Sequence, residues 1–257
     1  MTVMYEEIQE EPEAIRKTIN ENADKINKVI DQIKNSSLVF VTGSGTSYNA
    51  ALILNYTLLE NNKVVSIGHS NASYSQTMAG IDSGARLMTH FFNAMSPLKH
   101  REAGMVGAGL LSDSVYLELI GDMHHVSREA IKILLKTRDI DHIIGITDSL
   151  SIGGTTSADA KLGGLDVIKK DGVAWIRDTN TIAGSILTMD TAFQNLHEIV
   201  SDPVNLTKIF STNASKALSL KNTGYIDVGM DADINIIDDH MKVKGTMIRG
   251  CMIGDVK

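Results

Sequence analysis

The sequence has little cysteine and proline, and it has no long apolar run. Cys251 is the one cysteine among 257 residues, so no disulfide can form within the chain. With only three prolines there is no proline-rich linker, and no apolar stretch approaches the roughly 18 residues of a membrane-spanning helix. These absences argue against a disulfide scaffold, and they predict a cytoplasmic protein without a membrane segment.

Positive charge is also scarce. The 24 Lys and Arg residues are outnumbered by 31 Asp and Glu residues, which gives a net charge of −7. No dense basic stripe provides the electrostatic footprint of a nucleic-acid-binding surface. The first 14 residues, MTVMYEEIQEEPEA, are acidic and lack the apolar core of a signal peptide. We therefore expect neither nucleic acid nor a membrane as a partner.

The first sixty residues are predicted to form a helix, a strand and a second helix. Isoleucines recur at helical spacing in residues 12–35, which is the pattern of an amphipathic helix. The apolar run at 38–41 predicts a short strand. The glycine- and serine-rich turn at 42–47 ends that strand, and residues 49–60 favour a second helix.

Beyond residue 62 the pattern changes to alternating strands and helices. The predicted strands are short and rich in Val, Ile or Leu, and they cover residues 64–67, 86–89, 115–120 and 142–147. The predicted helices cover residues 73–83, 127–137 and 187–200. Buried strands that alternate with helices indicate an α/β fold with a parallel sheet.

The last third of the chain has a different pattern. Residues 163–176 read as two strands around the turn Lys170-Asp171-Gly172, which is a hairpin signal. Residues 203–220 favour one or two helices, and residues 232–237 and 242–248 alternate as strands do. We expect these terminal strands to form a small β-subdomain.

Polar residues of catalytic type follow four successive predicted strands. In chain order they are His69, His90, Asp122 with the pair His124 and His125, and Asp148. In (β/α) barrels the active site lies at the carboxyl ends of the strands. A single histidine at such a position is more often a structural residue, but four strand ends of this kind in order favour a functional site.

The residue types suit metal-assisted hydrolysis. Neutral imidazoles bind Zn²⁺ and similar divalent ions, which lower the pKa of a bound water toward about 7. A carboxylate such as Asp148 can accept a proton from water and return it to a leaving amine. A further histidine can polarise the carbonyl group that is attacked.

An ordered set of short strings runs through the sequence beyond residue 63. The strings are IGHSNA at 67–72, THFFNAMSP at 89–97, HRE at 100–102, ITD at 146–148, LGG at 162–164, TIAGS at 181–185 and DAD at 231–233. This set resembles the N-acetylglucosamine-6-phosphate deacetylase family of amidohydrolases. The resemblance covers about three quarters of the chain without interruption, from about residue 63 to the end. Each string is weak alone, and their order makes the resemblance specific.

The resemblance implies a reaction and a cofactor. The reaction is hydrolysis of the N-acetyl group of N-acetylglucosamine 6-phosphate, which yields glucosamine 6-phosphate and acetate. The cofactor is one divalent metal ion of the zinc or iron class. His69 and His90 match the metal ligands of the family, and Asp148 matches its catalytic acid and base.

The resemblance also implies a substrate site and an assembly. The matching substrate-binding residues are Asn93, Ala94, Arg101, His125, Ile182 and Ala183. Arg101 corresponds to a phosphate ligand, a role that suits the donor geometry of a guanidinium group. In the family this arginine can serve the site of a neighbouring subunit, which implies a homodimer.

The sequence departs from the family in several places. The third metal ligand of the family is a Glu in an early His-Leu-Glu-Gly-Pro-like motif, and this sequence contains no such motif. Met123 stands where the family usually has Gly, and His124 stands where it has an aliphatic residue. The alternative interpretation is therefore a catalytically inactive phosphosugar-binding remnant or a gene-fusion product.

Residues 1–60 resemble the start of a sugar-isomerase (SIS) domain. The resemblance rests on Ile8, Glu11, Pro12 and the string VTGSGTSYNAA at 41–51. It implies a possible phosphosugar loop at Ser44, Thr46 and Ser47, at the start of a helix where an anion binds well. A tight strand–helix turn with Ser47 as N-cap explains the same residues equally well, and a full isomerase module is the least favoured interpretation.

Together these observations predict an α/β protein in three parts. Residues 1–62 form the helix–strand–helix SIS-like segment. Residues 63–160 and 177–225 form a partial (β/α) TIM-like barrel, and residues 161–176 and 226–257 form the small C-terminal β-subdomain.

Overall fold

The computed structural model describes most of the chain beyond residue 63. It covers residues 64–253 except 163 and 171, together with strand β1 (Leu38–Val41) and eight helical positions between residues 20 and 32. The helical positions fall within the helix expected at 12–35, and β1 coincides with the strand expected at 38–41. The turn with Ser44, Thr46 and Ser47 and the helix expected at 49–60 lie outside the described residues.

The chain divides into two compact units, Met1–Val39 and Phe40–Lys257. All elements from β2 onward belong to the second unit. Within the described residues, no helix is long and apolar enough to cross a membrane.

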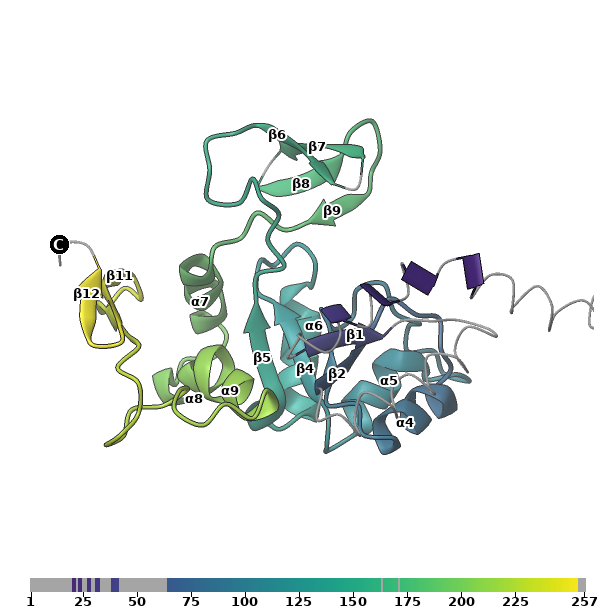
Figure 1. The fold of residues 1–257 in the computed structure, drawn as a ribbon, viewed down its shortest axis with the longest axis horizontal. Helices are drawn as coiled ribbons and strands as arrows, with labels where there is room; N and C mark the ends of the chain where they lie inside the picture. Colours follow the sequence, from purple (N-terminus) through teal and green to yellow (C-terminus); the bar gives the residue numbers. More distant parts are fainter. Residues whose placement is uncertain are drawn as a thin grey trace, which may run out of the picture. The chain divides into compact units, whose positions relative to one another are not determined.

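Parallel strands in chain order form the centre of the second unit (Figure 1). They are β2 (Val64–Ile67), β3 (Leu87–Met88), β4 (Tyr116–Ile120) and β5 (Ile143–Ile146). Each pairs in parallel with the next. The expected α/β fold with a parallel sheet is therefore confirmed, and the carboxyl ends of these strands lie at one edge of the sheet.

A helix connects each strand of this sheet to the next. The helices are α4 (Tyr74–Asp82), α5 (Gly104–Leu111) and α6 (Arg128–Thr137). Helix α4 begins with a capping box, in which Ser73 and Gln76 satisfy each other's backbone N–H groups. Helix α6 begins at N-cap Ser127, whose hydroxyl accepts the Ala130 N–H at 3.2 Å. These caps explain why the two helices start where the sequence predicts.

Helix α5 was not predicted from the sequence. It contains three glycines and has no charged residue in its first or last turn. Gly109 lets it pack closely, since a Cβ there would lie 2.4 Å from the Phe91 ring. The sequence hides this helix because its glycines have low helix propensity, whereas close packing on the sheet stabilises it.

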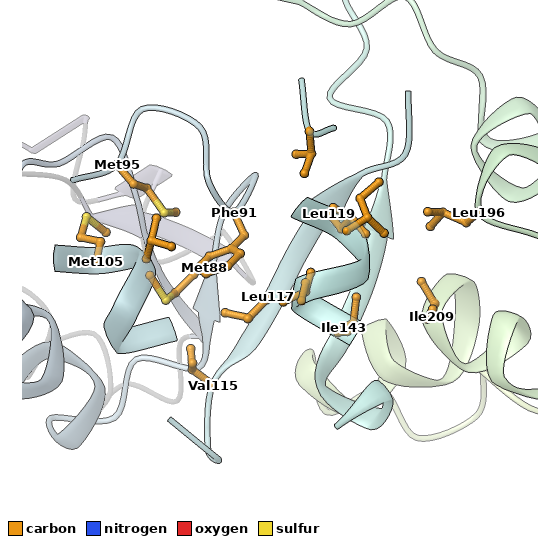
Figure 2. Packing of buried hydrophobic residues seen from close by; sticks show 14 of the residues in the cluster. Met88, Phe91, Met95, Met105, Val115, Leu117, Leu119, Ile143, Leu196 and Ile209 are labelled. Atoms are coloured by element: carbon orange, nitrogen blue, oxygen red, sulfur yellow. The ribbon is translucent and has the colours of Figure 1, made fainter. Parts of the chain in front are cut away.

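One apolar core joins the sheet to the helices (Figure 2). Met88, Leu117, Leu119 and Ile143 project from the strands and are fully buried. They pack with residues of the helices, among which are Met105, Ile131, Leu134, Leu196 and Ile209. This core holds the strands in register, and the register determines where the strand-end residues lie.

A second group of helices begins after residue 188 and packs against β5, the strand at one side of the parallel sheet. It comprises α7 (Met189–His197), α8 (Pro203–Thr207), the π-helical turn η2 (Lys208–Thr212) and α9 (Asn213–Ala217). The buried Asn213 amide donates to the carbonyls of Ile140 and Ile143 at 2.8 Å each. Asn213 thus ties η2 and α9 to the 3₁₀ turn η1 (Ile140–His142) and to the start of β5.

Two small antiparallel sheets complete the described chain. The first contains β6 (Asp159–Leu162), β7 (Leu165–Lys170), β8 (Val173–Ile176) and β9 (Ile182–Gly184). The second contains β10 (Ile234–Ile237), β11 (Val243–Ile248) and β12 (Cys251–Ile253). The expected hairpin is confirmed by the pairing of β7 with β8.

The two stretches that the sequence assigns to one β-subdomain therefore contribute to different sheets. Residues 161–176 belong to the sheet of β6–β9, whereas residues 226–253 supply β10–β12. The first sheet also includes residues 159–160 and strand β9, which the sequence assigns to the barrel. The division of the chain into three parts stays a prediction.

Gly145 on β5 gives a test of how tightly this sheet is packed. A Cβ at this position would lie 2.5 Å from the ring of Phe210, so Gly145→Ala is expected to destabilise the fold by about 1–3 kcal/mol. Gly80 in α4 has nothing within 4 Å of an added Cβ, so Gly80→Ala is expected to stabilise it by about 0.5–1 kcal/mol. Denaturant unfolding measures both, and equal effects would contradict the packing described.

Met123, just after β4, gives a test of backbone strain. Its φ of 62° is left-handed, a conformation that costs a side-chain-bearing residue about 1 kcal/mol. Both Met123→Ala and Met123→Gly remove the same contacts with the core, but only glycine relieves the strain. We expect the glycine variant to be more stable than the alanine variant by roughly 1 kcal/mol. An alanine variant as stable as the glycine variant in urea unfolding would show that the strain is absent.

Candidate functional site

Two histidines that follow adjacent strands lie in direct contact. His69 comes two residues after β2, and His90 comes two residues after β3. Their Nε2 atoms lie 2.7 Å apart, and their rings meet edge-on at 83°. The structure thus brings together the two residues that the sequence predicts as metal ligands.

The chain is held in an uncommon backbone conformation at four of the predicted site residues. His69, His90 and Asp148 have φ values of 48°, 32° and 48°, and Ala94 has a φ of 49°. Only about a few per cent of non-glycine residues have positive φ. Such conformations persist where the surrounding structure enforces them, and they cluster at functional sites.

Backbone pairing beyond the strands fixes the two histidine loops to each other. The Ser70 N–H donates to the Ala94 carbonyl at 3.0 Å, and the Ser96 N–H donates to the Ser70 carbonyl at 3.1 Å. These bonds form an isolated parallel bridge between Ser70 and Met95. The loops after β2 and β3 therefore cannot separate without breaking this pairing, and the His69–His90 contact is held from both sides.

His90 lies in an environment that favours its neutral form. It is buried, whereas His69 is exposed. Burial lowers the pKa of His90, and the nearby His69 imidazole lowers it further. A neutral ring keeps a free lone pair, which is the form that binds a metal ion. Nδ1 of His90 is buried, and no described residue hydrogen-bonds to it.

Asp148 follows β5 and lies within electrostatic range of His90. Its backbone is paired with Ser185, the residue after β9 (Ile182–Gly184), because the Ser185 N–H donates to the Asp148 carbonyl at 3.0 Å. The Ser185 hydroxyl also donates to the Thr147 carbonyl. Ile182 and Ala183 are half-buried and lie on β9, just before the residues that approach this segment. A Cβ added at Gly184 would lie 3.6 Å from the Asp148 carbonyl oxygen.

His125 forms a buried pair with Asp122 after β4. Its Nδ1 lies 2.6 Å from Oδ2 of Asp122, and the two side chains are 9% and 8% exposed. The other carboxylate oxygen, Oδ1, accepts the backbone N–H groups of His124 and His125. Although burial raises the pKa of Asp122, these hydrogen bonds outweigh it and leave the pKa below its usual value.

The remaining predicted substrate residues lie on the loop after β3. The Asn93 amide donates to the carbonyls of His90 and Phe91 at 3.2 and 3.3 Å, so its side chain stabilises the turn that carries His90. Ala94 is exposed and has a left-handed φ of 49°. Arg101 is exposed, and among the described residues no hydrogen bond or ion pair joins it to the histidines.

Glu118 is a further residue beside His90 that the sequence did not predict as part of the site. It lies within the apolar strand β4, opposite Ile144 of β5. Burial raises the pKa of its carboxyl group, while polar contacts with the Thr89 side chain and the His90 backbone oppose this shift. The carbonyl of Glu118 also accepts the Phe91 N–H at 2.6 Å. A single charged residue in an otherwise apolar strand is the signal that could have revealed it.

The paired imidazoles fit two ligands of a divalent ion. Two nitrogen ligands of a tetrahedral Zn²⁺ are separated by about 3.3 Å, so the 2.7 Å between the Nε2 atoms needs only a small increase. Imidazole nitrogen suits zinc, iron and other first-row ions. Within the described part of the chain, however, no third His, Cys, Asp or Glu joins the pair in a metal-binding group.

Most of the chain is similar to known proteins of one family. The Amidohydrolase family model matches residues 59–253. A protein from Lysinibacillus sphaericus, described as N-acetylglucosamine-6-phosphate deacetylase, is 37% identical over 195 residues, which make up 76% of this chain and 50% of that protein. The chain thus spans about half the length of the curated relatives it matches.

The chain is also similar in fold to solved structures of such deacetylases. N-acetylglucosamine-6-phosphate deacetylase from Thermotoga maritima aligns with a TM-score of 0.76 and 35% identity, over 83% of this chain and 58% of that one. The Mycobacterium smegmatis enzyme, solved as a D267A mutant with N-acetyl-D-glucosamine-6-phosphate, aligns with a TM-score of 0.82 and 29% identity, over 89% and 61%. The strand-end histidines and the similarity over three quarters of the sequence lead to one conclusion: this chain belongs to the amidohydrolase family.

Proposed function

We propose that this chain takes part in hydrolysis of the N-acetyl group of N-acetylglucosamine 6-phosphate, giving glucosamine 6-phosphate and acetate. The observation that carries the proposal is the contact between Nε2 of His69 and Nε2 of His90, with Asp148 in electrostatic range of His90. The relatives described as deacetylases support the choice of reaction. The parallel strands in chain order support a partial (β/α) barrel as the scaffold.

In this proposal each strand end has its own role. His69 and His90 hold one divalent ion of the zinc or iron class, which when bound lowers the pKa of water and so supplies a nucleophile near neutral pH. Asp148 accepts a proton from the attacking water and returns it to the departing amine. His125 faces the substrate with its Nε2, since Nδ1 is hydrogen-bonded to Asp122.

The sugar phosphate is proposed to lie across the loops beside these groups. Asn93 and Ala94 come three and four residues after His90. Ile182 and Ala183 lie on β9, which is followed by Ser185, the residue that pairs with the Asp148 segment. Arg101 is exposed and supplies a guanidinium group for the phosphate. A homodimer in which Arg101 serves the neighbouring subunit and a cytoplasmic setting stay predictions.

A second candidate function is binding of a phosphosugar without turnover. It is favoured by the two-histidine donor set, because in the part of the chain that the structure describes no third protein ligand completes a metal-binding group. Catalytic zinc sites usually have three protein ligands. Metal content and turnover, measured on the same protein, separate the two functions.

The first prediction of the proposal concerns metal content. Purified wild-type protein is expected to carry about one divalent ion per chain, and His69→Ala should lose it because one imidazole alone binds weakly. His240→Ala, which changes an exposed histidine, is the matched control and should keep the ion. Elemental analysis measures all three proteins. A metal-free wild type with a normal melting transition would contradict the proposed deacetylase and leave phosphosugar binding.

The second prediction concerns turnover. Wild-type protein supplied with zinc or iron is expected to release acetate from N-acetylglucosamine 6-phosphate, and Asp148→Asn should slow the release by about 10²-fold or more because the proton acceptor is lost. Asp166→Asn alters an exposed carboxylate on β7 and should leave the rate unchanged. If calorimetry shows substrate binding while no acetate forms, the second candidate function replaces the first.

A further inference from the structure

The Asp122–His125 pair uses the two carboxylate oxygens for different tasks. Oδ1 accepts two backbone N–H groups, those of His124 at 2.9 Å and His125 at 2.8 Å. Oδ2 lies 2.6 Å from Nδ1 of His125. A carboxylate offers acceptors alone, so a ring nitrogen at this distance must carry the proton. Across the described residues, Nε2 of His125 has no hydrogen-bond partner.

The segment that carries the pair is fixed from the neighbouring helix. The Asn195 side chain on α7 donates to the Gly121 carbonyl at 2.9 Å. A Cβ at Gly121 would lie 3.4 Å from Ala192 and Leu196 of the same helix. Both members of the pair are more than nine-tenths buried. The carboxylate therefore cannot rotate away from the ring without losing its two backbone hydrogen bonds.

We propose that Asp122 is a positioning residue that fixes the tautomer of His125. It holds the neutral ring with its proton on Nδ1, so Nε2 presents a lone pair to the substrate. The nitrogen that a histidine offers is set by the hydrogen bond that its other nitrogen makes. Because an acceptor nitrogen cannot polarise a carbonyl oxygen, polarisation of the attacked carbonyl does not fall to His125 in this tautomer. The identity of the group that Nε2 meets, an N–H or hydroxyl of the amino sugar, rests on the proposed function. The tautomer itself does not.

Replacing Asp122 with asparagine separates this role from a purely structural one. The Asn side-chain oxygen can still accept the two backbone N–H groups, so the turn should keep its shape. The amide NH₂ then replaces Oδ2 and points its hydrogens at Nδ1. Two donors cannot face each other, so the proton must move to Nε2, which turns the substrate-facing nitrogen from an acceptor into a donor.

The test is a long-range ¹H–¹⁵N correlation spectrum of the histidine rings at a pH where they are neutral. His125→Gln assigns the signals, and His124→Gln, which changes the exposed neighbour, is the matched control. We expect the Nδ1–H tautomer in the wild type and in the control, and the Nε2–H tautomer in Asp122→Asn. The melting temperature of Asp122→Asn should stay close to that of the wild type, whereas Asp122→Ala should melt lower because the backbone caps are lost.

The tautomers observed in the wild type and in Asp122→Asn show whether Asp122 fixes the ring of His125. An Nε2–H tautomer in the wild type, or an unchanged Nδ1–H tautomer in a folded Asp122→Asn, would overturn it. If the chain releases acetate, kcat/KM of Asp122→Asn should fall about tenfold or more, because a substrate donor then meets another donor. A switched tautomer with unchanged kcat/KM would overturn the substrate-facing role. If the chain releases no acetate, the proposed function fails but the tautomer measurement still stands.

Discussion

Parallel pairing of β2, β3, β4 and β5 is the constraint on which the candidate site depends. Because the strands pair in chain order, the residue that follows each of them emerges at the same edge of the sheet. The pairing continues beyond the strands through the bridges Ser70–Met95 and Ser149–Ser185. His69, His90 and Asp148 therefore do not lie on free loops but on backbone that is hydrogen-bonded on both sides of the residue. The left-handed conformations at these three positions, each costing on the order of 1–3 kcal/mol, persist because this pairing and the apolar core beneath it leave the chain no alternative.

A second layer of polar contacts gives the strand-end side chains their orientation. Asp122 holds the ring of His125, Asn93 holds the turn after His90, and Ser185 holds the segment of Asp148. Burial adds an electrostatic effect, since it lowers the pKa of His90 and favours the neutral ring. The candidate site thus contains two imidazoles in contact and a carboxylate within electrostatic range of one of them. A third imidazole, held by Asp122, follows the neighbouring strand β4. These are the residue types that the proposed metal-assisted hydrolysis requires.

Much of this arrangement could be predicted from the sequence, and the reasons are local. Ser73 and Ser127 mark helix starts because their hydroxyls cap backbone N–H groups, and the apolar runs mark buried strands. The contact between His69 and His90 follows from their equivalent places after adjacent strands. Helix α5 was missed because tertiary packing overrides the low helix propensity of its glycines. Strands β6–β9 and β10–β12 form two separate sheets, and Glu118 lies beside His90. Both features depend on pairing between distant parts of the chain, which no local pattern encodes.

We propose that His69 and His90, placed by adjacent parallel strands, share one divalent ion. X-ray absorption at the zinc K-edge identifies the atoms that bind the metal in the purified protein. Imidazole ligands are recognised there by a characteristic outer-shell scattering pattern. We expect two imidazole nitrogens at about 2.0–2.1 Å from the metal, and we expect His69→Ala to retain too little zinc to give this signal. A spectrum with oxygen ligands alone, or one that His69→Ala leaves unchanged, would contradict this proposal.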